Sequence, residues 1–285
     1  MGKIKTFFKV ILPPFFLILY RKLFVSKFSV DNIMTQRKKN QYWDGNYESW
    51  EIAGTFCKGY DSDIIINKCF DAIQKIKNGE AIYERDSVLF DKKEYSTGLL
   101  AGLMLAGHSN VGEISVLDFG GSLGTTYFQN KQFFNYFESC KWGIIEQQKF
   151  FEMGKKHFQD KELMFFENIE NCISDINPNV FLISSSLQYI SDPKQILFQI
   201  NNSSIRYVIF DRIPFSESEN LITIQTVPPV IYEASYPCWI FNDEWLLKQL
   251  SNYKVIFEFP SFCDADQLIN DGLLVQWKGI TLELI

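Results

Sequence analysis

The sequence predicts an α/β fold: a mostly parallel sheet with helices on both faces and an antiparallel strand at the C-terminus. From Ser115 onward, short apolar segments alternate with helix-forming ones, which is typical of a covered parallel sheet. The last two apolar segments, 254–259 and 272–285, are joined by a polar loop and predict the antiparallel end. With 285 residues, 46% of them hydrophobic, the chain can bury a large core, and wholesale disorder is excluded.

Six apolar segments predict the remaining strands of this sheet. They are 115–119, 141–146, 163–167, the start of 179–190, 206–212 and 221–227. Helices are expected at 125–139, 147–160, 192–200 and 242–250. Two of them have clear start signals, because Pro193 stands at a first helical position after Asp192, and Asn242 is a favourable N-cap.

The region before this alternation predicts a helical extension over residues 41–110, ahead of the sheet domain at 111–285. Residues 64–76 place apolar side chains at three- and four-residue steps, as in an amphipathic helix, and 97–106 form a small apolar helix. Trp43 and Trp50 lie in a polar aromatic stretch of this extension. We favour aromatic packing that holds the stretch on the core over a lid above a pocket.

The N-terminal segment, residues 1–40, differs from the rest of the chain in charge. Residues 1–39 hold nine Lys/Arg and one Asp, although the whole chain has a net charge of −6, which argues against a nucleic-acid partner. The apolar run 10–20 is too short to span a bilayer and contains Pro13-Pro14. We expect peripheral contact with an anionic, cytoplasmic membrane face; the alternative is a strap on the protein's own surface.

Cysteine and histidine usage indicates neither a metal site nor a disulfide framework. The six cysteines form no C-x-x-C pair, and the two histidines, His108 and His157, lie far apart. We therefore expect reduced cysteines in a cytoplasmic setting and no bound metal.

The strongest local signal is the segment 116–126, VLDFGGSLGTT. A strand ends at Asp118, a turn with Gly120, Gly121, Ser122 and Gly124 follows, and then a helix begins. Glycines let the backbone approach a ligand closely, and the first N–H groups of the helix can donate to an anionic group. In an open parallel sheet this turn borders the ligand crevice.

A second acid supports a nucleoside ligand. Glu146 ends the next predicted strand, where a carboxylate can accept hydrogen bonds from both ribose hydroxyls. Because dinucleotide-binding folds use an acid at the same place, Glu146 indicates adenosine ribose and leaves the cofactor open.

The glycine turn resembles motif I of class I S-adenosylmethionine (SAM) methyltransferases, D/E-x-G-x-G-x-G. Asp118, Gly120 and Gly124 match, whereas Ser122 replaces the middle glycine. The resemblance implies a Rossmann-like class I methyltransferase fold with SAM as cofactor. It also implies that the turn containing Asn168 contacts adenine, and that Ser185, Gln188 and Tyr189 line the methionine end and the substrate mouth.

Longer strings are similar to a bacterial methyltransferase family associated with surface-polysaccharide (O-antigen) biosynthesis. They include W-D-G-x-Y-x-S-W at 43–50, SSSLQYISDP, IFDRIPF and PPVIYEASYPCWIF, and the similarity covers about residues 40–255. It implies a small polar acceptor, such as a sugar or glycan intermediate.

Candidate catalytic groups are few. Asp211 and Arg212 leave a buried strand together and either pair with each other or serve as a base and an anion clamp. Glu233 is a second candidate base. Tyr232 and Tyr236 could read a sugar ring or simply pack at the turn before Pro237.

Two other classes of protein remain open. One is a non-catalytic binding or scaffold protein with a degenerate pocket, suggested by Ser122. The other is an NAD(P)-dependent reductase, which would need a third spacing glycine and a Tyr-x-x-x-Lys pair. The match Tyr127…Lys131 falls in the first helix after the glycine turn, the wrong place.

Overall fold

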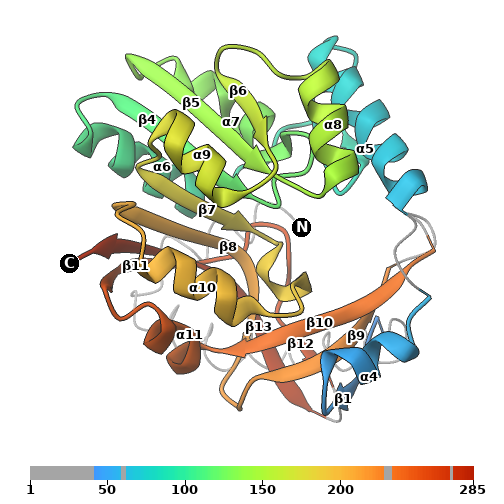
Figure 1. Cartoon of the computed structure of the whole chain (residues 1–285). Coiled ribbons are helices and arrows are strands. Elements are labelled where there is room, and N and C mark those ends of the chain that lie inside the picture. Colours follow the sequence, from blue (N-terminus) through green and yellow to red (C-terminus); the bar gives the residue numbers. More distant parts are fainter. Residues whose placement is uncertain (1–41, 59–61, 228–232, 270–271) are drawn as a thin grey trace, which may run out of the picture. The chain divides into compact units, whose positions relative to one another are not determined.

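A central sheet organises the part of the chain that the computed structural model describes, residues 42–58, 62–227, 233–269 and 272–285. The N-terminal segment 1–40 and Tyr232 lie outside these residues. The helices are α4 (Trp50–Thr55), α5 (Ser62–Lys77), α6 (Thr97–Ser109), α7 (Thr125–Phe134), α8 (Gln148–His157), α9 (Ile169–Ile176), α10 (Pro193–Asn201) and α11 (Asp243–Gln249), with a 3-10 turn, η2, at Leu187–Tyr189 (Figure 1).

Five neighbouring strands run parallel in the order β6-β5-β4-β7-β8. Their bounds are β4 (Glu113–Phe119), β5 (Ser139–Ile145), β6 (Leu163–Phe166), β7 (Val180–Ser184) and β8 (Tyr207–Ser216). The chain moves from β4 outward to β5 and β6 and then returns to β7 on the other side of β4. The strand order therefore reverses between β4 and β7, where open α/β sheets bind ligands.

The C-terminal strand is antiparallel, as predicted. β13 (Leu273–Leu284) pairs antiparallel with β8 on one side and with β11 (Tyr253–Pro260) on the other. A short strand, β12 (Gln267–Ile269), also pairs with β13. The fold is thus the mostly parallel, Rossmann-like sheet that the alternating pattern predicts.

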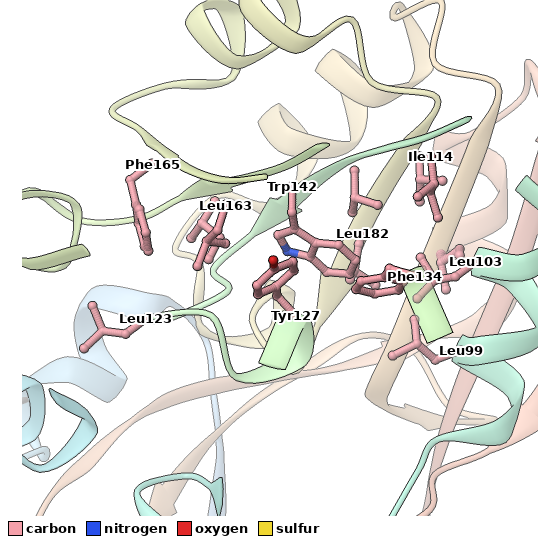
Figure 2. Close-up of a cluster of buried hydrophobic side chains, with 14 of the residues drawn as sticks. Leu99, Leu103, Ile114, Leu123, Tyr127, Phe134, Trp142, Leu163, Phe165 and Leu182 are labelled. Atoms are coloured by element: carbon pink, nitrogen blue, oxygen red, sulfur yellow. The ribbon is translucent and has the colours of Figure 1, made fainter. Parts of the chain in front are cut away.

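Helices cover both faces of the parallel strands, because alternate strand residues point to opposite faces. Val116 of β4 and Leu182 of β7 belong to a core that also holds residues of α5, α6, α7 and α8. Their neighbours Leu117 and Phe181 belong to a second core that holds residues of α9, α10 and α11. Figure 2 shows part of the first core, in which Trp142 of β5 packs beside Tyr127 and Phe134 of α7.

Beyond the end of β8 the sheet continues as an antiparallel arm. It consists of β10 (Ser235–Asn242), β9 (Leu221–Thr226) and β1 (Trp43–Tyr47). β10 joins β8 through a short parallel pairing at Phe215 and Ser216. The arm carries α4, whose Trp50 stacks on Trp239 of β10 with ring centroids 6.1 Å apart.

The region expected to be a helical extension is therefore of mixed structure. It contains α4, α5 and α6, and also β1 and a hairpin of two short strands, β2 (Tyr83–Arg85) and β3 (Val88–Phe90). It belongs to the same compact unit as the sheet, Tyr42–Ile285. None of the helices in the described part of the chain is both long and apolar enough to cross a membrane.

Candidate functional site

A cavity of about 1080 Å³ opens at the carboxyl ends of the parallel strands, where the strand order reverses. One wall comes from the ends of β4, β5 and β7, at residues 119–122, 145–147 and 184–186. The opposite wall comes from the arm, with Trp43, Trp50, Tyr236 and residues 225–227. The β2–β3 hairpin, Arg212 and residues 263–265 also line it. The volume is sufficient for a nucleoside-sized ligand and a second small molecule.

The glycine turn forms the floor of this cavity at the end of β4. Gly120 has φ +74°, and a Cβ atom there would lie 2.4 Å from the Ser186 Cβ. Its N–H donates to the Ile145 carbonyl at 2.9 Å, which ties the turn to β5. Gly124, with φ +104°, is the N-cap of α7. The backbone conformation and the close packing at Gly120 both exclude a larger side chain, as the motif predicts.

Ser122 occupies a left-handed conformation, φ +53°, that favours glycine. Its N–H donates to Glu146 Oε1 at 2.9 Å. The residue that departs from the motif thus keeps the motif's backbone shape and connects the glycine turn directly to the acid at the end of β5.

Glu146 lines the cavity and is held by two backbone donors. Its Oε1 accepts from Ser122, and its Oε2 accepts from the Gln147 N–H at 3.0 Å. Burial raises the pKa of this carboxyl, and the two N–H donors oppose the increase. Because a carboxylate has about four acceptor positions, it can still accept hydroxyl donors from a ligand.

Asp118, in contrast, lies behind the glycine turn and does not line the cavity. Its side chain is 1% exposed, and Oδ2 accepts from the Trp142 indole N–H at 2.9 Å. A Cβ atom on Gly121 would lie 2.5 Å from that oxygen, so the turn covers the carboxyl. Burial raises the pKa of Asp118 to about 7. The expectation that Asp118 and Glu146 face one cavity holds for Glu146 only, because the strand alternation turns Asp118 toward Trp142.

The end of β7 contributes a polar edge to the same wall. Ser185 lines the cavity with φ +55°, and its Oγ accepts from Gln188 Nε2 at 3.2 Å. Gln188 is fully buried behind it. Tyr189 lines the cavity, and its hydroxyl donates to Gln225 Oε1 of β9 at 2.7 Å. Tyr236 of β10 packs edge-on against Tyr189 at 5.1 Å, so these residues join the two walls.

Asn168 does not share this cavity. It is exposed and serves as the N-cap of α9, where its side chain accepts from the Asn171 N–H at 2.8 Å. Capping uses one side of this oxygen, and the adenine contact expected of the turn that contains Asn168 stays a prediction.

Asp211 is buried away from the cavity and does not pair with Arg212. Its two oxygens accept from Ser96 Oγ at 3.0 Å and Ser184 Oγ at 2.9 Å, and its side chain is 1% exposed. Burial raises its pKa. Because it is buried and does not line the cavity, Asp211 does not have the position of a base that contacts substrate.

Arg212 lines the cavity, but two carboxylates already neutralise it. Its Nε donates to Asp264 Oδ2 at 2.8 Å, and its Nη2 donates to Asp86 Oδ2 at 3.2 Å. Burial alone would raise the pKa of Asp264, yet Arg212 holds that pKa below its ordinary value. The predicted anion clamp is thus an ion-paired group with an excess of negative charge.

Glu233 is on the surface rather than in the cavity. Its side chain is 74% exposed and lies 3.8 Å from the Lys58 ammonium. It is not among the residues that line the cavity. The exposed position does not support its predicted role as a base.

Several cavity residues were not predicted from the sequence. Glu84 of β2 is 4% exposed, lines the cavity and accepts from the Thr125 hydroxyl and the Ser87 N–H. Burial raises its pKa to about 7, so this carboxyl can gain or lose a proton near neutral pH. Asp86, Asp264, Gln225 and Trp277 also line the cavity. The sequence contains one local indication of the β2–β3 turn, the pair Asp86-Ser87. Asp and Ser are common in tight turns, and Asp tolerates a left-handed backbone.

Backbone strain is concentrated at this cavity. Seven non-glycine residues in the described part of the chain have positive φ, and five of them line the cavity: Asp86, Ser87, Ser122, Ser185 and Arg212. Residues in sparsely populated backbone conformations cluster at ligand sites, where the surrounding structure holds them in place. This distribution identifies the cavity as the candidate functional site.

The pair that a reductase would need is elsewhere. Tyr127 is fully buried in the first core and donates to Glu162 Oε2 at 2.9 Å, and Lys131 lies near the same carboxylate. Neither lines the cavity. Among the described residues, no group of three or more His, Cys, Asp or Glu could hold a metal ion.

No family model matches the sequence, and no curated protein matches it. Among solved structures, the N-terminal domain of EvdMO1, crystallised in the presence of S-adenosylhomocysteine (SAH) and D-fucose, is similar with a TM-score of 0.44. It is 8% identical, and the match covers 79% of this chain and 98% of that one. A SAM-dependent methyltransferase from Clostridium acetobutylicum has a TM-score of 0.42 at 10% identity, covering 76% of this chain and 98% of that one.

A third similar structure is magnesium protoporphyrin IX methyltransferase from Synechocystis with bound SAM, with a TM-score of 0.40 at 8% identity. The match covers 80% of this chain and 99% of that one. At such identities and TM-scores these likenesses do not decide what this chain does, so its function rests on its own residues.

Proposed function

We propose that this chain is a SAM-dependent methyltransferase that acts on a small polar acceptor. The observation that carries the proposal is the direct link between the glycine turn after β4 and Glu146 after β5, both on one cavity at the point where the strand order reverses. That arrangement suits a nucleoside ligand, because the turn admits a close backbone approach and the acid accepts from ribose hydroxyls.

The residues present fit SAM. Glu146 has acceptor positions left for two hydroxyls, and Gly120 leaves the floor without a side chain. Thr125 and Thr126, at the start of α7, line the cavity where helix N–H groups can donate to a carboxylate. When bound, SAM supplies an activated methyl group. The chain's part is to bind the nucleoside and hold the acceptor in line with that methyl.

We place the acceptor against the arm. Aromatic side chains and hydrogen-bonding groups meet there, with Trp43, Trp50 and Tyr236 beside Tyr189 and Gln225. Aromatic faces with polar groups suit a sugar-like ring. Together with the resemblance of strings such as 43–50, this supports a sugar or glycan intermediate of surface-polysaccharide biosynthesis as the acceptor. A mass increase of one CH₂ group in surface glycans, present only in cells that make the protein, is the expected sign; unchanged glycans would contradict this assignment.

We further propose that residues 1–39 attach the protein to an anionic, cytoplasmic membrane face. The support is their excess of Lys/Arg next to the apolar run 10–20. Deleting residues 1–30 should move the protein from the membrane fraction to the soluble fraction. An unchanged distribution would contradict the attachment.

Isothermal titration of the full chain with SAM, and separately with NADH, tests the main proposal. We expect heat with SAM alone. Replacing Glu146 by Gln (E146Q) should weaken SAM binding roughly 10- to 100-fold, because hydrogen bonds to a charged acceptor contribute about 1.5–3 kcal/mol each. The matched control is E152Q, which replaces an exposed acid of α8 that accepts a hydrogen bond from Gln148 Nε2.

The other outcomes identify the alternatives. Heat with NADH alone would indicate a reductase. No heat with either ligand would indicate a non-catalytic binding or scaffold protein. If E146Q binds SAM as the unaltered chain does, the ligand is not held at the end of β5.

A further inference from the structure

The cavity carries an excess of negative charge. Five charged residues line it in the described part of the chain: Glu84, Asp86, Glu146, Asp264 and Arg212. Four of these are acids and one is a base. A concave site walled by low-dielectric protein concentrates the field of such groups, so the charge of a ligand affects how tightly it binds.

Arg212, the single base in this set, does not neutralise all four acids, because it forms ion pairs with two of them. Arg212 has a side chain 14% exposed and contacts Asp264 at 2.8 Å and Asp86 at 3.2 Å. Arg212, Asp86 and Asp264 together therefore carry one net negative charge. A phosphate or carboxylate of a ligand would have to displace one of these ion pairs to reach the guanidinium.

The β2–β3 hairpin supplies two of the four acids from one turn. Glu84 is buried beside the start of α7, where its oxygens accept from the Thr125 hydroxyl and the Ser87 N–H, which are neutral donors. Asp86, two residues later in the chain, forms an ion pair with Arg212. Asp86 and Ser87 both have positive φ, which fixes the turn between the glycine loop and Arg212.

We infer that the β2–β3 hairpin, through Glu84 and Asp86, makes this cavity select a cationic ligand over a neutral ligand of the same shape. The inference rests on the proposed function, because the sulfonium of SAM carries a positive charge that SAH, its demethylated product, lacks. Burial raises the pKa of the Glu84 carboxyl to about 7, and a cation bound beside it favours the ionised form. The same hairpin then favours exchange of the neutral product for fresh cofactor.

The test compares two ligands that differ in one methyl group and one charge. Isothermal titration of the full chain at pH 7.5 should give a dissociation constant for SAM at least about tenfold lower than for SAH. In E84Q and in D86N this ratio should fall about threefold or more, chiefly through weaker SAM binding. The control is D91N, which removes an exposed acid just after β3, outside the cavity.

Equal affinity for the two ligands in the unaltered chain would overturn the inference, as would a ratio unchanged in both E84Q and D86N. Asp86 is 55% exposed, so D86N tests the inference even if E84Q fails to fold. Binding of neither ligand would overturn the proposed function itself, and the selection with it. Binding of both without discrimination would leave the proposed function standing and overturn only the selection.

Discussion

The two walls of the cavity are built in different ways. The wall at the ends of β4, β5 and β7 consists of turns that follow strands of one parallel sheet. The opposite wall is the arm, in which β1 pairs with β9 and β10 from a much later part of the chain. The first wall follows the general rule for ligand sites at the carboxyl ends of parallel strands, whereas the second depends on pairing between distant segments. We therefore assign the cofactor to the first wall and the acceptor to the second.

The largest expected effect on the cofactor wall comes from a substitution at Gly120. In G120A the new Cβ would meet Ser186 at 2.4 Å, and the residue would be held at φ +74°. We expect SAM affinity to fall roughly 100-fold or more, because the turn must move to relieve both problems. Isothermal titration measures the loss.

The matched control for G120A is G54A in α4. A Cβ atom there meets nothing within 4 Å, and no positive φ is required. G54A should bind SAM normally. If G120A also binds normally, the glycine turn is not part of the cofactor wall.

A second prediction concerns the pH dependence of stability that two buried acids produce, Asp118 behind the glycine turn and Glu84 of the β2–β3 hairpin. Burial raises the pKa of Asp118 and of Glu84 to about 7 each. The folded chain therefore keeps protons that the unfolded chain releases. The stabilisation is fully present below the unfolded pKa values, near 4, and is lost as pH rises toward and through 7. Each acid should lower the free energy of unfolding by roughly 2–4 kcal/mol between pH 4 and pH 8.

Urea unfolding of D118N at several pH values measures this contribution. The amide oxygen can still accept from the Trp142 indole, so the substitution removes the titration and keeps the packing. The loss of stability between pH 5 and pH 8 should become smaller than in the unaltered chain. An identical pH dependence would mean that Asp118 is ionised in the folded state with an ordinary pKa.

Part of this site could be predicted from the sequence, and part depends on tertiary contacts. The glycine turn and Glu146 were predictable because the carboxyl ends of consecutive parallel strands converge at one edge. The antiparallel C-terminal strand followed from the apolar pattern of the last segments. The complete burial of Asp118 under the glycine turn was not predictable, since it depends on that turn and on a contact with Trp142, 24 residues away.

The β2–β3 hairpin and the contacts of Arg212 could not be predicted from the sequence, for a physical reason. β2 and β3 have three residues each, too short for a periodic pattern, and Arg212 meets Asp264 across 52 residues. Nothing local indicates that Arg212 pairs with Asp264 and Asp86 while its neighbour Asp211 turns to Ser96 and Ser184. Glu84 likewise owes its raised pKa chiefly to tertiary burial, with a smaller contribution from the Asp86 charge.

The smallest expected effect tests whether the two walls act separately. Gln225 of β9 accepts from the Tyr189 hydroxyl at 2.7 Å on the acceptor side. Replacing it by alanine should change SAM affinity by less than about fivefold, because the substitution removes one neutral hydrogen bond between the two walls and such a bond contributes about 1 kcal/mol. Isothermal titration alongside G120A gives the comparison. A loss as large as that in G120A would show that cofactor and acceptor walls cannot be distinguished.

A crystal structure of the full chain grown with SAH tests the central claim most directly. The account predicts the nucleoside over the turn at Gly120 and Gly121, with ribose hydroxyls within hydrogen-bond distance of the Glu146 carboxylate. A nucleoside bound away from Glu146 would contradict it. So would a Glu146 carboxylate that points away from the bound nucleoside.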